Sequence, residues 1–297
     1  MPIRSNPVQW HRPRRGMAGR HRIENLCSGM GRHMLITLSS NALRAQLTGS
    51  SPELDLLDLP RLARDEFGFS GLQLTTSLLK GWDAKKIEKL RDRADKAACP
   101  CLVLVEEQSH QLGELEGDTT ERVIDRMTKV MQVAHRLGCS SVAMSLADAP
   151  DEDAEDLVAE NLRDVVRAAE RLELNLLLSL SEGLTGTPEQ LSGLIRKVGG
   201  FRIGSFPSFA QAAASGDPAS YLKAIVPYAS AVTASCGAFD AKGKHAAFAI
   251  ETCVEAIKAV GYDGTLAVES NSGPKAMEQV ASCKSAIEEV LDAGVET

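Results

Sequence analysis

The 297-residue chain lacks several features that would assign it to a protein class at once. It has no run of about 18 apolar residues, so the sequence predicts no membrane-spanning helix. Aromatic residues make up only 4% of the chain, which argues against a stacking surface for single-stranded nucleic acid. The chain has no excess of positive charge: it contains 33 Lys and Arg and 40 Asp and Glu, which gives a net charge of −7. A general nucleic-acid binder is therefore not expected. The remaining composition, 43% apolar and 25% charged, is that of a globular protein.

The seven cysteines form no recognisable pairing or metal pattern. Their number is odd, their spacing is scattered, and Cys99-Pro100-Cys101 is one residue short of the usual redox motif. No group of Cys and His has the spacing of a zinc finger. The cysteines therefore predict free thiols, no structural disulfide and a reducing, cytoplasmic environment.

Basic residues are concentrated at the start of the chain. Residues 1–33 contain seven Arg and one acidic residue, Glu24, so that residues 34–297 carry a net charge of −13. Three interpretations are open: an arm for nucleic acid or an acidic partner, a transit-like segment, or a start assigned upstream of a true start at Met34. In each case we expect residues 1–33 to be disordered and residues 34–297 to form one domain.

From Met34 onward, short apolar segments alternate with longer amphipathic ones. We expect strands at Met34–Leu38, Gly71–Thr75, Cys101–Glu106, Ser141–Ser145, Leu174–Ser179, Phe201–Ser205, Ala229–Ser235 and Gly264–Glu269. We expect helices at about residues 53–66, 83–97, 118–137, 151–171, 187–198, 217–225, 246–261 and 274–293. The strand starts are 27 to 40 residues apart, which is the size of a βα unit.

Local patterns support both the helices and a parallel sheet. Thr187-Pro188-Glu189-Gln190 combines an N-cap Thr, a Pro at the first helical position and a Gln three residues after the cap. Strand segments such as Leu102-Val103-Leu104-Val105 are continuously apolar, which is typical of strands covered on both faces. Eight βα units in about 264 residues predict a (β/α)8 TIM barrel. The alternative, a doubly wound open sheet, usually carries a Gly-rich phosphate loop, and the chain has neither G-x-G-x-x-G nor a P-loop.

In a TIM barrel the active site lies at the C-terminal ends of the strands, so polar residues at these ends are the candidates. The predicted ends carry Gln73, Glu106, Glu107, His110, Ser145, Asp148, Ser179, Ser181, Glu182, Ser208, Thr233, Ser235 and Glu269. Strand alternation directs one of Glu106 and Glu107 into the barrel, as a candidate base, and the other outward to the surface. The serines have no visible His and Asp partners at suitable strand ends, so a nucleophilic triad is not expected.

The order of several segments resembles that of the xylose isomerase-like barrels. Phe67–Leu74 is similar to the G-aromatic-x-G-apolar-E-apolar second strand of that family, and Ala134–Cys139 to its A-x-x-L-G before strand 4. Three further segments fit the same order: Gly183–Leu191, Phe239–Gly243 and Val260–Glu269. The resemblance covers residues 34–293. The family includes sugar and sugar-phosphate isomerases and epimerases and some endonucleases.

The resemblance implies a site for a divalent metal such as Mn²⁺, Mg²⁺ or Zn²⁺. In the family pattern a Glu ends strand 5, an acid follows strand 6, a His ends strand 7 and a Glu ends strand 8. The matching positions here hold, in the same order, Ser179, Ser208, Thr233 and Glu269. Two further family positions, a His and a Lys, fall on Ser181 and Ser235. Because neutral hydroxyls are poor ligands for divalent ions, we expect the metal site to be lost and no metal cofactor to be bound.

Two hypotheses on function follow. In the first, the protein is a non-catalytic scaffold or binder whose partner is a small, sugar-like molecule, held in a mouth lined by Ser179, Ser181, Ser208, Thr233, Ser235 and Lys242. In the second, it is an isomerase or epimerase that works without metal, or with a metal site rebuilt from Glu106, Glu107, His110, Glu182 and Glu269. A homo-oligomer is open in both.

Several candidates have simpler interpretations. His110 fits a solvated loop histidine, and Glu182 fits an exposed loop residue. Asp240, Lys242, Lys244 and His245 fit a solvated loop after strand 7, although Lys242 and Lys244 could also meet a phosphate or a sugar acid. Glu269 is favoured as a residue that lines the site, because it ends strand 8.

Overall fold

The computed structural model describes residues 34–48, 52–113, 117–147, 154–240, 243–270 and 273–293. The prediction of a disordered segment at residues 1–33 lies outside this part of the chain. Within it, strands pair only in parallel and form an eight-stranded sheet in the order β6-β5-β4-β3-β2-β1-β8-β7. The strands are β1 (Leu35–Ser39), β2 (Leu72–Thr75), β3 (Cys101–His110), β4 (Ser141–Leu146), β5 (Asn175–Leu178), β6 (Ile203–Ser205), β7 (Ala231–Cys236) and β8 (Thr265–Ser270).

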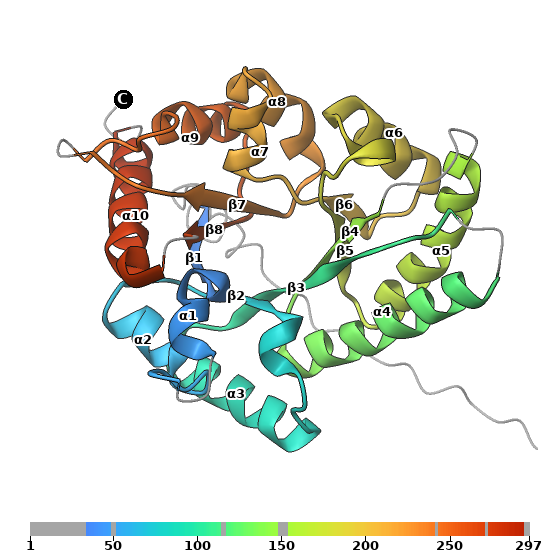
Figure 1. Cartoon of the computed structure of the whole chain (residues 1–297), viewed down its shortest axis with the longest axis horizontal. Coiled ribbons are helices and arrows are strands. Elements are labelled where there is room, and N and C mark those ends of the chain that lie inside the picture. The colour runs from blue at the N-terminus through green and yellow to red at the C-terminus, as the bar shows by residue number, and fades with distance from the viewer. Residues whose placement is uncertain are drawn as a thin grey trace, which may run out of the picture. The chain divides into compact units, whose positions relative to one another are not determined.

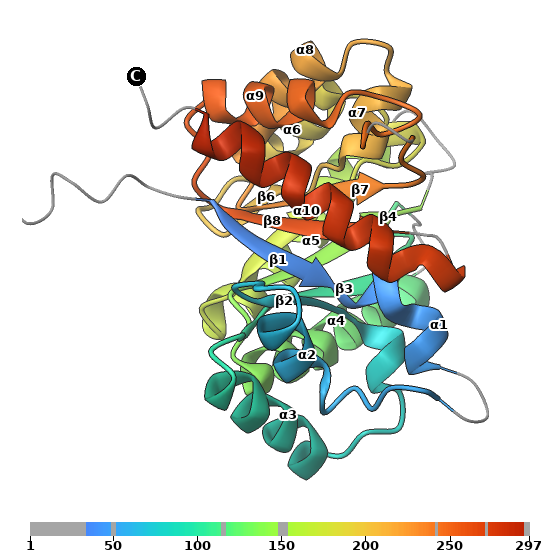
Figure 2. The ribbon, with the colours of Figure 1, turned by 90° about the vertical axis from the view of Figure 1, so that its left-hand side faces the viewer.

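Helices surround this curled sheet, so the predicted (β/α)8 barrel is confirmed (Figure 1). The α-helices are α1 (Arg44–Leu47), α2 (Leu59–Asp65), α3 (Ala84–Lys96), α4 (Gly117–Leu137), α5 (Glu155–Arg171), α6 (Pro188–Val198), α7 (Phe209–Ala214), α8 (Pro218–Ile225), α9 (Ile250–Ala259) and α10 (Ala276–Asp292). Short 3-10 helices are η1 (Ser40–Leu43), η2 (Thr76–Leu79), η4 (Gly183–Thr185), η5 (Val226–Tyr228) and η6 (Gly273–Lys275). Figure 2 shows α10 in front of β8, and this helix also contacts β7 and η1.

Several predicted boundaries are wrong, for example that of the helix expected at 246–261, since α9 begins at Ile250. Strand β3 continues past Glu106 to His110, because Ser109 and His110 pair with β4 beyond an irregularity in the register. The helix predicted at 53–66 is shorter, since α2 begins at Leu59 with a Pro in its first turn. Phe201, predicted inside a strand, is fully exposed before β6 begins.

The sheet closes into a barrel through a thin seam between β6 and β7. Only two isolated parallel bridges join these edges among the described residues, Ser205 with Ala229 and Ser208 with Thr233. The backbones approach so closely that a Cβ on Gly204 would lie 2.4 Å from the carbonyl oxygen of Tyr228. A glycine is therefore required in β6 at this position.

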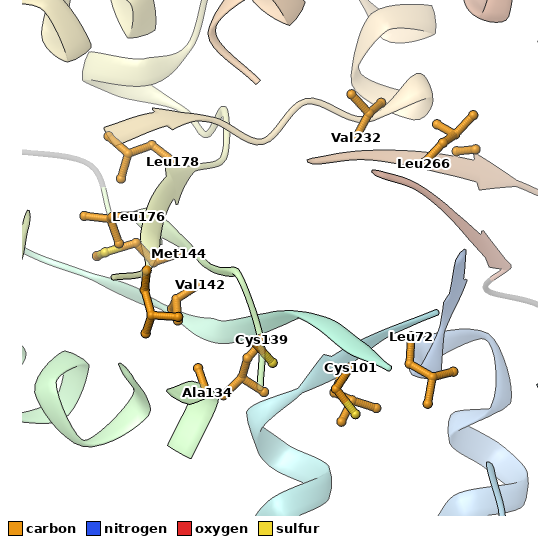
Figure 3. Close-up of a cluster of buried hydrophobic side chains, with 14 of the residues drawn as sticks. Leu72, Cys101, Ala134, Cys139, Val142, Met144, Leu176, Leu178, Val232 and Leu266 are labelled. Carbon is orange, nitrogen blue, oxygen red and sulfur yellow. The ribbon is translucent and has the colours of Figure 1, made fainter. Parts of the chain in front are cut away.

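Side-chain alternation along the strands produces two apolar layers. Leu72, Val142, Met144, Leu176 and Val232 belong to the large cluster that the strands bury under the helices (Figure 3). The neighbouring strand positions face the barrel interior and form a smaller cluster of Val103, Ala143, Leu177, Phe206 and Ala231. Above this inner cluster, the same alternation places polar residues at the ends of the strands.

The cysteines are free in the described part of the chain, as their spacing predicts. The described cysteines, Cys99, Cys101, Cys139, Cys236, Cys253 and Cys283, are free and buried. Burial raises the pKa of Cys99 to about 11 and that of Cys139 to about 12, so both stay protonated near neutral pH. No helix in the described ranges is long and apolar enough to cross a membrane.

Candidate functional site

A cavity of about 220 Å³ opens in the mouth of the barrel, at the C-terminal ends of the strands. Side chains on the strands or directly after them line it: Asn41, Gln73, Thr75, Val105, Glu107, Ser179, Phe206, Ser208, Gln211, Thr233, Ser235 and Glu269. Seven of these are candidates at the predicted strand ends, namely Gln73, Glu107, Ser179, Ser208, Thr233, Ser235 and Glu269. The strand alternation thus brings most of the predicted positions together, whereas their roles stay predictions.

Glu269, near the end of β8, is held by Ser39 at the end of β1. Ser39 Oγ donates a hydrogen bond to Glu269 Oε2 at 2.6 Å. Ser39 Oγ in turn accepts from the backbone N–H of Asn41 at 3.3 Å and from Gln73 Nε2 at 3.4 Å. Because both of these neighbours donate, the hydroxyl proton of Ser39 is directed to the carboxylate. The orientation of Glu269 is therefore fixed by a buried network before any ligand enters.

Gln73 contributes an acceptor without a partner. Its side chain is only 2% exposed, and its Nε2 is used by Ser39. Its Oε1 is buried and has no hydrogen bond. Buried polar atoms nearly always have a partner, since an unsatisfied one destabilises the fold by about 1–3 kcal/mol. Gln73 lines the cavity, so this unused acceptor belongs to the wall of the mouth.

Glu107 lies at the rim of the cavity in an ion pair with Arg44 of α1. The two side chains are about one-third exposed. The same guanidinium donates to Asn41 Oδ1 at 2.7 Å, to Ser77 Oγ at 3.1 Å and to Thr75 Oγ1 at 3.3 Å. Arg44 therefore holds the carboxylate of Glu107 and two hydroxyls in one network at the edge of the mouth.

The hydroxyls of Ser208 and Thr233 are positioned by backbone structure. Ser208 begins α7 with a capping box: its Oγ accepts from the N–H of Gln211 at 3.3 Å, and Gln211 Oε1 accepts from the N–H of Ser208 at 3.1 Å. Ser208 also bridges to Thr233, which is buried in β7. A hydroxyl that accepts in a cap keeps its own proton for a further bond. The mouth thus carries both donors and acceptors on a rigid frame.

Comparison with known proteins assigns this fold to a family. The model of the xylose isomerase-like TIM barrel family matches residues 61–287. The chain belongs to this family. No curated protein matches it in sequence.

Solved structures of the family share the barrel across nearly the whole chain. L-ribulose 3-epimerase superposes with a TM-score of 0.73 at 15% identity, covering 88% of this chain and 97% of that one. A D-tagatose 3-epimerase-like protein has a TM-score of 0.68 at 18% identity, covering 89% and 99%. The 3-keto-D-glucoside 4-epimerase of E. coli has a TM-score of 0.67 at 14% identity, covering 85% and 98%. At these identities the likeness shows a common fold alone.

The mouth does not fit the metal site that the family resemblance implies. The positions expected to supply ligands hold Ser179, Ser208, Thr233 and Glu269, and all four line the cavity. In the described ranges, no group of three or more His, Cys, Asp or Glu could hold a metal ion. One carboxylate among neutral hydroxyls is a weak donor set for a hard divalent cation. The loss of the metal stays a prediction, and the donor chemistry supports it.

Ser181 and Glu182 are predicted site residues that do not line the cavity. Ser181 Oγ donates to the carbonyl oxygen of Leu146 at 2.7 Å and lies 2.8 Å from Thr185 Oγ1, so it closes the loop after β5. Glu182 is exposed at the start of η4, in agreement with its simpler interpretation. Lys242 lies outside the described residues.

His110 is not the solvated loop residue of the simpler interpretation, nor does it line the mouth. It ends β3, is 9% exposed, and its Nε2 is buried without a hydrogen bond. Burial lowers its pKa below the usual 6.5, and the nearby Arg126 lowers it further, while Glu106 acts in the opposite direction. His110 is therefore a neutral, buried group on the helix side of the strand near neutral pH.

Glu106 and Glu107 point to opposite sides of β3, as alternation predicts. Glu107 faces the mouth, whereas Glu106 is directed outward. The expectation of a surface position for the outward acid is wrong, since the Glu106 side chain is only 1% exposed under α4. Arg126 of α4 donates to Glu106 Oε2 from Nε at 3.1 Å and from Nη2 at 2.7 Å. This ion pair makes the burial of the carboxylate tolerable.

The loop after β7 is ordered by His245. His245 Nε2 accepts from the N–H of Gly237 at 2.8 Å, and Nδ1 lies 3.2 Å from the carbonyl oxygen of Phe248. The ring also packs on Phe239 and Phe248. Burial lowers its pKa, which matches a neutral ring that accepts at Nε2. His245 is thus a structural residue of the loop, and Lys244 beside it is exposed.

Sequence analysis missed seven residues of the site: Ser39, Asn41, Arg44, Thr75, Val105, Phe206 and Gln211. The sequence carries a signal for Ser39, because this residue directly follows the first predicted strand, Met34–Leu38. Arg44 and Gln211 lie on helices, α1 and α7, which the apolar periodicity did not predict. Only the Ser208 to Gln211 spacing of a capping box indicated the second of them.

Proposed function

We propose that the protein binds a small, polyhydroxylated, sugar-like molecule in the mouth of its barrel, without a divalent metal ion. The observation that carries this proposal is the buried, unpartnered Oε1 of Gln73 beside the oriented carboxylate of Glu269. Both residues line one cavity, and a sugar offers neighbouring hydroxyl groups that can donate to such acceptors. The hydroxyls of the mouth can donate to or accept from the remaining sugar oxygens.

The size and the apolar part of the cavity support the same class of ligand. A volume of about 220 Å³ lies below the usual range for drug-sized ligands, which favours a molecule no larger than a monosaccharide. Val105 and Phe206 add an apolar surface on which the C–H face of a sugar ring can pack. The family's solved structures include several sugar epimerases, which is consistent with this class.

The test is a thermal-unfolding and calorimetric titration of the full chain with a panel of ketohexoses and pentuloses, with and without EDTA or Mn²⁺. We expect one sugar to raise Tm in a saturable way, since a native-state ligand at 100 times its Kd adds about 2.7 kcal/mol. Gln73→Leu should weaken binding about tenfold, because a ligand hydroxyl loses its acceptor. Gln132→Leu, on the exposed side of α4, is the matched control. Stoichiometric metal with an EDTA-sensitive Tm would contradict the proposal.

A metal-free isomerase or epimerase is the second candidate. The observation that favours it is that two carboxylates, Glu107 and Glu269, line the same cavity. Epimerisation by proton transfer needs an acid–base group on each face of the reacting carbon. The bound sugar should therefore exchange its C–H proton with solvent D₂O, as followed by NMR. A sugar that binds without exchange identifies a binder rather than an enzyme.

A further inference from the structure

A second, larger cavity lies outside the barrel mouth. It has a volume of about 530 Å³ and is formed by η2 and the two residues after it, the end of β3, and one side of α4. This volume is within the range typical of small-molecule sites. We call it the outer cavity. It shares only Glu107 and the neighbouring network of Arg44 with the mouth, so the two cavities are separate spaces with one common wall.

The lining of the outer cavity has two parts. An apolar set consists of Leu79, Val130 and Val133, of which the first two are buried. A cationic set consists of Lys80, Arg126 and Lys129. Arg126 and Lys129 are three residues apart on α4, so they project from the same side of this helix. Lys80 comes from the segment after η2 and meets them across the cavity.

Arg126 is fixed in place by a buried partner. Its two bonds to Glu106 Oε2 hold the guanidinium against β3, and Glu106 is 99% buried on its side-chain surface. The Arg126 side chain is 46% exposed, and it lines the cavity. A cation that is oriented before binding loses little conformational entropy when an anion arrives.

The two lysines are not neutralised within the fold. In the part of the chain that the structure describes, neither Lys80 nor Lys129 has an ion pair or a hydrogen-bonded acid. The two carboxylates of the cavity already form ion pairs: Glu106 pairs with Arg126, and Glu107 pairs with Arg44. Residues 34–297 carry a net charge of −13, so a cluster of three cations around one cavity departs from the rest of the domain.

We propose that the outer cavity binds a small organic anion with an apolar body. The carboxylate or phosphate group of the ligand pairs with the cationic set, and its hydrocarbon part packs on the apolar set. Neither a neutral sugar nor a bare inorganic anion uses both parts of the lining. This site does not depend on the ligand of the barrel mouth, and it stands whether or not the proposed function is correct.

The experiment is a titration of the full chain with 2-naphthoate, followed by fluorescence anisotropy and calorimetry. We expect saturable binding at one site and weaker binding as NaCl rises from 50 to 500 mM, because salt screens the lysines. The neutral analogue 2-naphthamide and inorganic phosphate should each bind at least about tenfold more weakly. Phenyl phosphate distinguishes a phosphate preference from a carboxylate preference.

Variants locate the site. Lys80→Met with Lys129→Met should weaken 2-naphthoate about tenfold, since two exposed charges are lost from the ligand's surroundings. Lys85→Met with Lys89→Met removes the same charge from the exposed surface of α3 and should leave binding unchanged. Gln73→Leu in the mouth should also leave it unchanged.

Two results would overturn the proposal. One is 2-naphthoate binding that is insensitive to the loss of Lys80 and Lys129. The other is equal binding of 2-naphthamide, which would mean that only the apolar set is used. Loss of 2-naphthoate binding in Gln73→Leu alone would place the anion in the mouth and equally reject the outer cavity. A failure of sugar binding in the mouth would leave each of these measurements interpretable.

Discussion

Ser39 Oγ lies 2.6 Å from a carboxylate oxygen of Glu269, although 230 residues separate the two along the chain. The pairing of β1 with β8 produces this contact, since it places the end of the first strand beside the end of the last. Ser39 is fully buried, and its Oγ accepts hydrogen bonds from two further donors. Its own hydroxyl proton is therefore directed to the carboxylate of Glu269. The position of the Glu269 carboxylate in the mouth is therefore fixed by the fold.

The first prediction tests this contact against its neighbour. Ser39→Ala should lower the free energy of unfolding by about 1.5–3 kcal/mol, because it removes a hydrogen bond to a charged group and leaves buried donors without an acceptor. Ser40→Ala is the matched control, since Ser40 Oγ is buried without a partner, and its removal should be neutral within about 0.5 kcal/mol or stabilising. Urea denaturation measures both. Equal losses would mean that the Ser39 bond contributes nothing specific.

The second prediction concerns the buried ion pair on the outer side of β3. Arg126→Met leaves the carboxylate of Glu106 buried without its ion-pair partner and should destabilise the protein by about 3–5 kcal/mol. The double variant Glu106→Leu with Arg126→Met should recover most of this loss, because no charge is then left in the apolar surroundings. Guanidinium denaturation of the parent, single and double variants forms the test. A double variant as unstable as the single one would contradict the account.

The third prediction follows from the buried histidine of β3. Because burial lowers the pKa of His110, the unfolded chain binds a proton at a higher pH than the native protein does. The contribution of neutral, buried His110 to the free energy of unfolding is therefore fully present above pH 6.5 and is lost as pH decreases below this value. His110→Phe should reduce the difference in unfolding free energy between pH 7.5 and pH 5.5. His245 retains its own contribution in the same direction.

The control for this experiment is His135→Gln, which removes an exposed imidazole near the end of α4. It should leave the pH dependence of the parent unchanged. Urea denaturation at the two pH values, in the same buffer and ionic strength, gives the comparison. If His110→Phe lost stability between pH 7.5 and 5.5 as steeply as the parent, the buried histidine would not be the source.

The fourth prediction compares two glycines. Gly204→Ala should destabilise the protein by about 1–3 kcal/mol, because the new methyl group would lie 2.4 Å from the carbonyl oxygen of Tyr228. Gly193→Ala, in the interior of α6 with no atom within 4 Å of the new Cβ, should instead stabilise by up to about 1 kcal/mol. Thermal unfolding of the two variants should therefore move Tm in opposite directions.

Most of the fold could be predicted because its signals are local. The continuously apolar strands and the amphipathic helices each follow from a few neighbouring residues, and Thr187 with Gln190 forms the predicted capping box. The extent of β3 could not be predicted, because Ser109 and His110 are polar and become strand only by pairing with β4. The exposed position of Phe201 likewise depends on where β6 meets its neighbour.

The site could be predicted in part. Strand ends and alternation gave the positions of Thr233 and Glu269, since both follow from counting along a strand. The contacts between strands could not be obtained in this way: neither Ser39 on Glu269 nor Arg44 on Glu107 has a local signal. The outer cavity depends on the approach of Lys80 to α4, which is likewise a tertiary contact.

The thin seam between β6 and β7 has a mechanical consequence. A ring of strands yields where the fewest hydrogen bonds cross it, and here that place is the join of Ser205 with Ala229 and of Ser208 with Thr233. Ser208 and Thr233 also line the mouth. Local opening of this join would also widen the mouth. Amide protons along the join should therefore exchange with solvent first, and a molecule bound in the mouth should slow their exchange.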